Sequence, residues 1–185
     1  MKAGLIALLL LLTSSSALAA KNPKVLMQTS KGDITIELNA ELAPISTKNF
    51  LDYVNTGFYA DTIFHRVISH FMIQGGGFTA ELNQKTPREP IKNEAANGLK
   101  NLRGTIAMAR TNNPNSATSQ FFINVQDNRS LDKSPINDGY AVFGKVIDGM
   151  NVVDDIRFVE TGYSKGMGDV PGETITIISA KVITD

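Results

Sequence analysis

The spacing of apolar and polar residues along the chain predicts a protein built mostly of short β-strands. Ile34, Ile36 and Leu38 recur at a spacing of two, which places them on one face of a strand. The polar segment 30–33 before them carries Gly and Asp, which is typical of a hairpin turn. Apolar runs of this kind predict strands over residues 25–29, 34–38, 64–68, 71–74, 105–109, 120–125, 141–146 and 175–182.

Two segments have the spacing of a helix instead. Pro44 suits the first turn of a helix, where a missing backbone N–H costs nothing. Phe50 and Val54 lie about one turn apart, and Gly57 favours an end to the helix. A second helix is predicted over residues 149–157. We expect the first helix to cover an open end of a sheet.

The remaining long segment, residues 79–103, is polar and irregular and contains Pro87, Pro90 and Gly98. It is typical of an ordered surface loop within one domain. Many short strands with only two helices indicate a mainly β protein. Its antiparallel sheet must either close on itself or pack against a second sheet, because open edges favour association with other chains.

Residues 1–19 have the pattern of a cleavable export signal. Lys2 is the charged start, residues 3–12 form the apolar run, and Ala17 and Ala19 are the small residues that a signal peptidase inspects. A membrane-spanning helix needs about 20 apolar residues, so this run is too short to be an anchor. We expect cleavage after Ala19, one domain over residues 20–185, a periplasmic location and no membrane association after processing.

Composition narrows the chemistry. Lys plus Arg and Asp plus Glu both number 18, and loss of Lys2 with the signal hardly changes that balance, so nucleic acid and anionic membranes are not favoured as partners. The chain has no cysteine, which excludes disulfides, thiolate metal sites and cysteine nucleophiles. It also lacks a zinc H-E-x-x-H motif, a phosphate-binding loop and a G-x-S-x-G motif. His65 is interpreted as a structural residue.

The most informative stretch is residues 64–77, FHRVISHFMIQGGG. Within nine residues it combines the permanent cation of Arg66, the amide of Gln74 and the apolar side chains of Phe71 and Met72. A guanidinium has five directed N–H donors and can bind a peptide carbonyl while a hydrophobic ring lies beside it. Met72 and Gln74 are two residues apart and share a strand face. The stretch therefore suits an uncharged substrate that carries a ring, and proline is the obvious ring.

This stretch resembles the signature of the cyclophilin family. Two further blocks resemble the same family in the same order, AMAR at 107–110 with SQFFI at 119–123, and YAVFGKV at 140–146. The resemblance runs from about residue 24 to the C-terminus. Within the family, the chain resembles the bacterial periplasmic (A-type) cyclophilins. It implies a closed eight-stranded antiparallel barrel with a helix over each end and a ligand groove on the outside.

The activity that the resemblance implies is peptidyl-prolyl cis-trans isomerisation. Rotation about an X-Pro bond has a barrier of roughly 20 kcal/mol, because twisting breaks the amide resonance. No bond is cleaved, so the enzyme needs only a site that binds the twisted amide better than the planar isomers. The resemblance implies that Arg66 is the main electrostatic group and that Gln74 binds the substrate backbone or braces Arg66. No cofactor is implied, the partners are proline-containing polypeptides, and we expect a monomer.

The resemblance also assigns the substrate-binding residues. Phe71, Met72, Phe122 and Leu131 match the proline pocket, although ordinary core packing would also explain them. Ala109 and Arg110 match a strand edge that pairs with the substrate backbone, so substrate choice should be broad. Gln120 matches a groove residue, and Tyr140 stands where relatives carry a histidine and can donate through its hydroxyl. Ser130 replaces the tryptophan whose indole N–H binds cyclosporin in eukaryotic members, so we expect weak cyclosporin binding.

Two other functions are compatible with the sequence. One is a binding module or chaperone that captures proline-containing segments without turnover. Arg66 argues against it, since the apolar pocket alone would be enough for capture. The other is a secreted structural protein that uses a different surface, for which residues 79–103 offer the best candidate.

Overall fold

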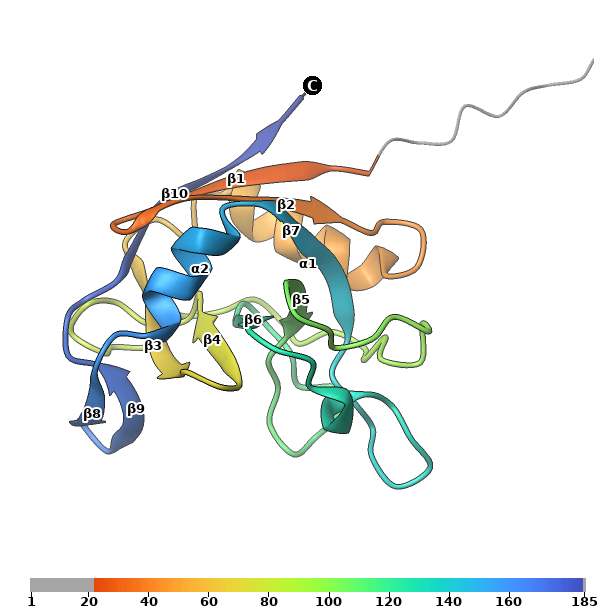
Figure 1. Cartoon of the computed structure of the whole chain (residues 1–185). Coiled ribbons are helices and arrows are strands. Elements are labelled where there is room, and N and C mark those ends of the chain that lie inside the picture. Colours follow the sequence, from red (N-terminus) through yellow and green to blue (C-terminus); the bar gives the residue numbers. More distant parts are fainter. Residues whose placement is uncertain (1–21, 185) are drawn as a thin grey trace, which may run out of the picture.

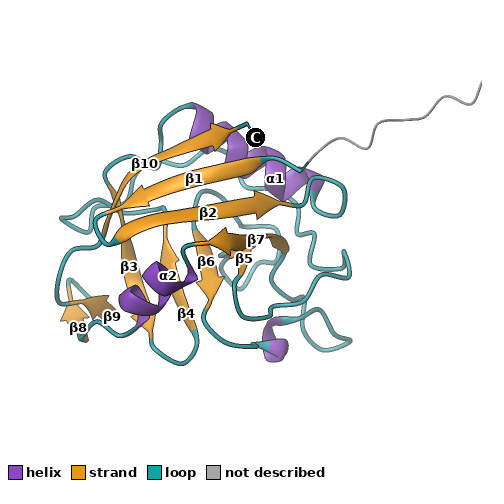
Figure 2. Ribbon diagram, turned by 45° about the horizontal axis from the view of Figure 1, so that its top comes forward, coloured by secondary structure: helices purple, strands orange, loops and turns teal. Residues whose placement is uncertain are grey.

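A computed structural model describes residues 22–184, and eight strands of this region form one closed antiparallel barrel (Figures 1 and 2). Around the barrel the strands follow the order β1, β10, β3, β4, β6, β5, β7, β2. Their bounds are β1 Lys24–Thr29, β2 Gly32–Leu38, β3 Thr62–Ile68, β4 Met72–Gly75, β5 Thr105–Met108, β6 Phe121–Asn124, β7 Val142–Asp148 and β10 Thr176–Ile183. The predicted closed barrel is confirmed, and each predicted strand is present with small shifts at its ends.

The hairpin of β1 and β2 shows how the alternating pattern becomes the core. Ile34, Ile36 and Leu38 are fully buried, as their spacing of two predicts. Gly32 in the turn has φ +131°, and a Cβ there would lie 2.8 Å from a methyl group of Val152. A larger residue at this turn would therefore collide with the second helix.

The two helices pack against the barrel. The helix α1, Pro44–Asn55, buries Phe50, Tyr53 and Val54, and the helix α2, Met150–Arg157, buries Val152, Val153 and Ile156. These side chains belong to the same buried cluster as the inward residues of the barrel. Both helices are confirmed, and Pro44 occupies the first turn as predicted. Neither helix in residues 22–184 is long and apolar enough to cross a membrane.

The start of α1 shows how the long loop is held. The carboxylate of Glu94 accepts hydrogen bonds from the backbone N–H groups of Ile45 and Ser46, at 2.9 and 2.7 Å. The first N–H groups of a helix have no partner within the helix, and a carboxylate there also interacts favourably with the helix dipole. Residues 79–103 are irregular, and contacts of this kind hold them against α1, in agreement with the predicted ordered loop.

Two features were not predicted. A short hairpin follows α2, with β8 at Thr161–Ser164 and β9 at Met167–Pro171, and β9 lies against β3 (Figure 1). A single turn of 3-10 helix covers Arg129–Leu131. The hairpin strands contain exposed polar and glycine positions rather than an alternating apolar pattern, so no strand is predicted there.

A second, smaller apolar cluster lies outside the main core. It contains Met72, Ala107, Phe122 and Val142, whereas neighbouring strand residues such as Ile73 belong to the main core. Successive residues of a strand point to opposite faces, so this second cluster marks the outer face of β4, β6, β5 and β7. Any groove built on it is outside the barrel.

Candidate active site

A cavity of about 260 Å³ lies over this outer cluster. All of the predicted site residues except Gln120 line it, and Gln120 lines an adjoining cavity of about 280 Å³ that shares three residues with the first. Residues from five different parts of the chain thus meet in one place. The lining residues are Arg66, Phe71, Met72, Gln74, Ala109, Arg110, Phe122, Leu131 and Tyr140.

The pairing of β3 with β4 places the two polar groups side by side. Arg66 and Gln74 are opposite each other in the register of the two strands. Residues that are opposite in a sheet have side chains on the same face. Arg66 Nε donates to a carboxylate oxygen of Asp169 on β9 at 3.2 Å, and both side chains are about two-fifths exposed. The guanidinium is therefore at the mouth of the cavity, braced from one side.

The amide of Gln74 is oriented by Gln120. Gln74 Nε2 donates to Gln120 Oε1 at 2.9 Å, and Asp169, not Gln74, is the hydrogen-bond partner of Arg66 among the described residues. The glycine run after β4 makes room for this pair, since a Cβ on Gly77 would lie 2.5 Å from the Gln120 side chain. Gln74 is predicted either to bind the substrate backbone or to brace Arg66. Because no hydrogen bond joins Gln74 to Arg66 among the described residues, binding of the substrate is the role that this geometry favours.

The apolar wall of the cavity has a buried floor and a partly exposed rim. Met72 and Phe122 are only 2% and 4% exposed, whereas Phe71 and Leu131 are partly exposed. The ring of Tyr140 meets Phe122 edge-on, with centroids 5.7 Å apart. A flat floor with a thioether beside it offers contact area to a small ring without polar groups that would need hydrogen bonds.

Arg110 fixes the position of Tyr140. Its guanidinium carbon lies 4.4 Å from the centroid of the Tyr140 ring, and its Nε donates to the Gly139 carbonyl at 3.0 Å. A guanidinium over an aromatic face is attracted by the negative charge of the ring face. The side chain of Arg110 is thus used within the site wall rather than held out toward solvent.

The hydrogen bonds of Ala109 narrow how this strand edge can pair with a substrate. The backbone N–H of Ala109 donates to the Gln120 carbonyl at 3.0 Å, so it is already paired within the protein. Ala109 lies one residue beyond β5 and continues the ladder to the β6 side. Only its carbonyl can take part in pairing with an extended substrate.

Three buried asparagines, which no sequence pattern predicts, support the rim of the cavity. Asn128 Nδ2 donates to the Phe71 carbonyl and to Asn124 Oδ1, both at 2.7 Å, and Asn124 in turn donates to Asn101 Oδ1 at 3.2 Å. Asn101 also donates to the Tyr140 carbonyl at 3.3 Å. Buried amides are stable only when paired, and this network fixes the backbone on both sides of the pocket.

His65 lies next to Arg66 in the chain but does not line the cavity. It is 5% exposed, its ring centroid lies 4.6 Å from that of Phe78, and its Nδ1 has no hydrogen-bond partner among the described residues. Burial, opposed in part by a hydrogen bond to the Ile63 backbone and assisted by the Arg66 charge, lowers the pKa of His65 to about 4. The imidazole is therefore neutral at physiological pH. His70 is exposed in the turn between β3 and β4 rather than on a strand face.

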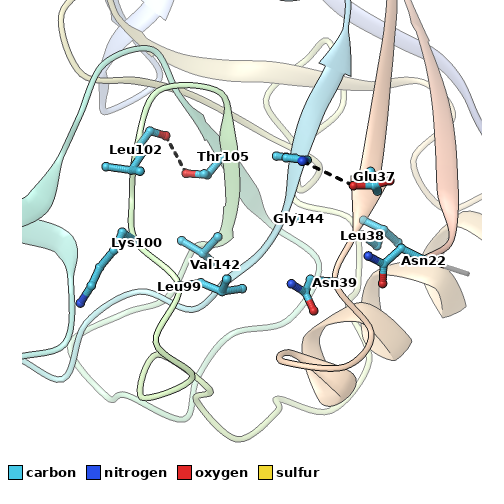
Figure 3. A pocket seen from close by; sticks show the side chains of 11 residues that line it. Asn22, Glu37, Leu38, Asn39, Leu99, Lys100, Leu102, Thr105, Val142 and Gly144 are labelled. Atoms are coloured by element: carbon cyan, nitrogen blue, oxygen red, sulfur yellow. Dashed lines mark hydrogen bonds and ion pairs between the residues drawn. The ribbon is translucent and has the colours of Figure 1, made fainter. Parts of the chain in front are cut away.

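Another cavity of about 340 Å³ lies between β2, β7 and the segment before β5 (Figure 3). Its walls include Leu38, Leu99 and Val142, and its charged pair is Lys145 with Glu37, whose nitrogen and oxygen are 3.6 Å apart. No aromatic ring lines it, and both of its lysines are paired, Lys145 with Glu37 and Lys100 with Asp132. It therefore lacks the aromatic floor and the available cation of the other cavity.

The described residues contain no cluster of three or more His, Cys, Asp or Glu side chains suited to hold a metal ion. The outer cavity offers a fixed cation and an amide at its mouth beside a flat apolar floor, at the side of a rigid barrel. Such a site binds a peptide carbonyl and an adjoining hydrophobic ring together. Fold and site thus define a barrel protein with an outer cavity suited to uncharged, ring-containing peptide segments.

Comparison with known proteins gives the family. The model of the cyclophilin type peptidyl-prolyl cis-trans isomerases matches residues 24–182. The chain is 54% identical to peptidyl-prolyl cis-trans isomerase A of Dickeya dadantii over 98% of this chain and 96% of that protein. It is 56% identical to peptidyl-prolyl cis-trans isomerase B of Escherichia coli over 85% of this chain and 98% of that protein. The chain therefore belongs to the cyclophilin-type peptidyl-prolyl cis-trans isomerases and is an enzyme of that class.

A solved structure agrees with this assignment. The chain superposes with a TM-score of 0.72 on a Cryptosporidium parvum cyclophilin-type isomerase, crystallised in the presence of the dipeptide Ala-Pro. The two share 29% sequence identity, and the match covers 88% of this chain and 99% of that one. The barrel and its helices are thus the cyclophilin fold that the sequence resemblance implied.

Proposed function

We propose that this protein accelerates rotation about X-Pro bonds in exported polypeptides, with Arg66 as the main electrostatic group and Gln74 as the orienting amide. The observation that carries the proposal is the meeting of these two polar side chains with the apolar floor of Met72 and Phe122 in one outer cavity. A protease-coupled assay on a series of proline tetrapeptides, with variants of Arg66, tests it.

The geometry suggests how the site lowers the barrier. The proline ring lies on the apolar floor, and the terminal nitrogens of Arg66 donate toward the proline carbonyl or the imide nitrogen. As the amide twists, its nitrogen lone pair loses resonance and becomes a better acceptor, so this interaction strengthens in the transition state. Lowering the barrier by about 7 kcal/mol would accelerate the rotation on the order of 10⁵-fold.

Recognition beyond the ring is expected to depend on the substrate backbone. Ala109 and Gln74 line both adjoining cavities and Gln120 lines one of them, so each can offer a backbone or amide group to the substrate. Contacts of this kind do not depend on substrate side chains, so a broad range of residues before proline should be accepted. We propose that the enzyme acts as a monomer, because the cation, the amide and the apolar floor that this mechanism uses are all supplied by a single chain.

The exported location rests on residues 1–19, which lie outside the described residues. We predict that the protein recovered from the periplasm begins at Ala20, because Ala17 and Ala19 are the small residues before the cut. Cleavage one residue later would place Leu18 at the first recognition position. Intact-mass measurement of the exported protein checks this. A mass that retains residues 1–19 would contradict both the cleavage site and the periplasmic product.

A further prediction concerns cyclosporin. Ser130 is exposed in the 3-10 turn beside the rim residue Leu131, so a larger side chain fits there without displacing the core. We expect the wild type to bind cyclosporin weakly and Ser130→Trp to bind it roughly 5- to 150-fold more tightly. This gain corresponds to about 1–3 kcal/mol of binding free energy, from one indole hydrogen bond and added contact area. Isomerase activity should change far less, since position 130 does not line the cavity.

Calorimetric titration of both proteins, with the isomerase assay run in parallel, makes this measurement. Ser130→Phe is the matched variant, because it adds a ring without the indole N–H. Tight binding by the wild type would show that Ser130 is not the limiting difference. A large loss of turnover in Ser130→Trp would show that this position belongs to the catalytic pocket.

A further inference from the structure

The residue that braces Arg66 comes from the hairpin that the sequence did not predict. Asp169 lies on β9, 103 residues further along the chain, and its Oδ2 accepts from Arg66 Nε at 3.2 Å. We propose that Asp169 is a positioning residue, which fixes the Arg66 guanidinium for the isomerase reaction. This inference rests on the proposed role of Arg66.

The hydrogen-bond pattern of the guanidinium supports this role. Asp169 takes the Nε–H, and within residues 22–184 the two terminal nitrogens of Arg66 have no hydrogen-bond partner. The guanidinium is planar, so fixing Nε also restricts the direction in which the terminal nitrogens point. Asp169 thus orients the guanidinium and leaves its four terminal N–H donors available for a substrate.

The hairpin that carries Asp169 is held at several points. Val170 is 9% exposed and anchors β9 against the barrel. At the base, the Gly172 N–H donates to the Glu160 carbonyl at 2.9 Å. At the tip, Lys165 Nζ donates to the Glu81 carbonyl. A carboxylate on such a tethered element has a defined position, which a brace for a flexible arginine requires.

The ion pair between Arg66 and Asp169 contributes little to the stability of the fold, so stability alone does not explain its presence. The side chains of Arg66 and Asp169 are 42% and 43% exposed, and pairs with that exposure contribute little to folding because water and salt screen them. Asp169 also has a positive φ of 60°, a conformation that disfavours most residues other than glycine, asparagine and aspartate. Strained backbone is found more often at functional sites, which agrees with a positioning role.

Because glycine and asparagine tolerate the positive φ of Asp169, two substitutions can be made there without added backbone strain. Asp169→Gly removes the carboxylate and relieves the backbone, and Asp169→Asn keeps the shape and removes the charge. We expect Asp169→Gly to lower kcat on the order of 3- to 10-fold through misorientation of Arg66, with KM nearly unchanged and Asp169→Asn in between. The thermal unfolding midpoint of Asp169→Gly should stay within about 2 °C of that of the wild type, because little stabilising free energy is lost. A merely structural residue would instead lose stability and leave kcat intact.

Glu173→Gln is the matched control. Glu173 follows the hairpin, pairs with Lys31 at 2.6 Å, is 53% exposed and lines no part of the outer cavity, so its loss should leave kcat unchanged. The decisive measurement is a double-mutant cycle with Arg66→Ala. We expect Asp169→Gly to have no further effect on kcat when Arg66 is absent.

The outcomes separate the two proposals. Wild-type activity in Arg66→Ala would overturn the role of Arg66 and, with it, the positioning role of Asp169. A large loss in Arg66→Ala with wild-type kcat in both Asp169 variants would overturn the role of Asp169 alone. An equal loss from Asp169→Gly with and without Arg66 would show that Asp169 acts independently of Arg66, which also contradicts the proposal.

Discussion

Replacing Arg66 with alanine is expected to lower kcat/KM for X-Pro isomerisation by at least about 10²-fold, roughly 2.7 kcal/mol of lost transition-state stabilisation. The physical reason is that the guanidinium is the one permanent cation at the mouth of the cavity whose terminal nitrogens are unpaired within residues 22–184. The other arginine of the cavity, Arg110, uses its side chain to hold Gly139 and Tyr140. Arg110 is therefore not placed to replace Arg66.

The fold should survive this change, because the side chain of Arg66 is 42% exposed and its ion pair is screened by water. Arg103→Ala is the matched control. Arg103 also is 42% exposed and also pairs with an aspartate, Asp154, at 2.8 Å, but it lies outside the cavity. The protease-coupled assay, with urea unfolding of each variant, should show the loss of activity in Arg66→Ala alone.

Arg66→Lys should also be a poor enzyme. A lysine keeps the charge but has no planar fork, so it cannot pair with Asp169 through Nε while directing two more nitrogens at a substrate. If either variant turned over at the wild-type rate, Arg66 would not be the electrostatic group. The alternative of a module that binds proline segments without turnover would then gain support.

The barrel could be predicted from the sequence because its core obeys a local rule. Residues such as Ile34, Ile36 and Leu38 alternate strictly, and one buried face of a strand leaves little choice of register. The proline signal at the start of α1 is equally local. Closure of the sheet is a long-range property, and it was predicted only because three motifs resembled a known family.

The residues of the site also fall into a group that local motifs predict and a group that they do not. The residues that line the cavity, except Leu131, lie in the recognised motifs, so the resemblance predicted them together. The residues that brace them do not. Asp169 is partly exposed and far along the chain, and Asn101, Asn124 and Asn128 are polar residues whose burial no apolar pattern reveals. Such contacts depend on how distant segments meet, which spacing along the sequence does not encode.

Acid should destabilise this protein through His65. Burial lowers its pKa to about 4 in the folded state, against 6.5 for an accessible histidine, so the unfolded chain binds a proton more readily. Stability should therefore fall as the pH drops from about 6.5 toward 4, and this contribution should level off below 4. The full loss is roughly 3 kcal/mol, on the scale of 1.36 kcal/mol for each unit of pKa difference.

Urea unfolding of the wild type and His65→Phe between pH 7 and pH 4 measures the contribution of His65 to the loss of stability in acid. Phenylalanine keeps the ring contact with Phe78 and cannot take up a proton, so the variant should lose about 3 kcal/mol less on acidification. The carboxyl pKa of both Asp52 and Asp154 is lowered by cationic partners, which adds acid sensitivity mainly below pH 4 in both proteins alike. His70→Gln, which removes the exposed histidine, should behave like the wild type. Equal pH dependence in the wild type and His65→Phe would mean that the buried imidazole does not control acid stability.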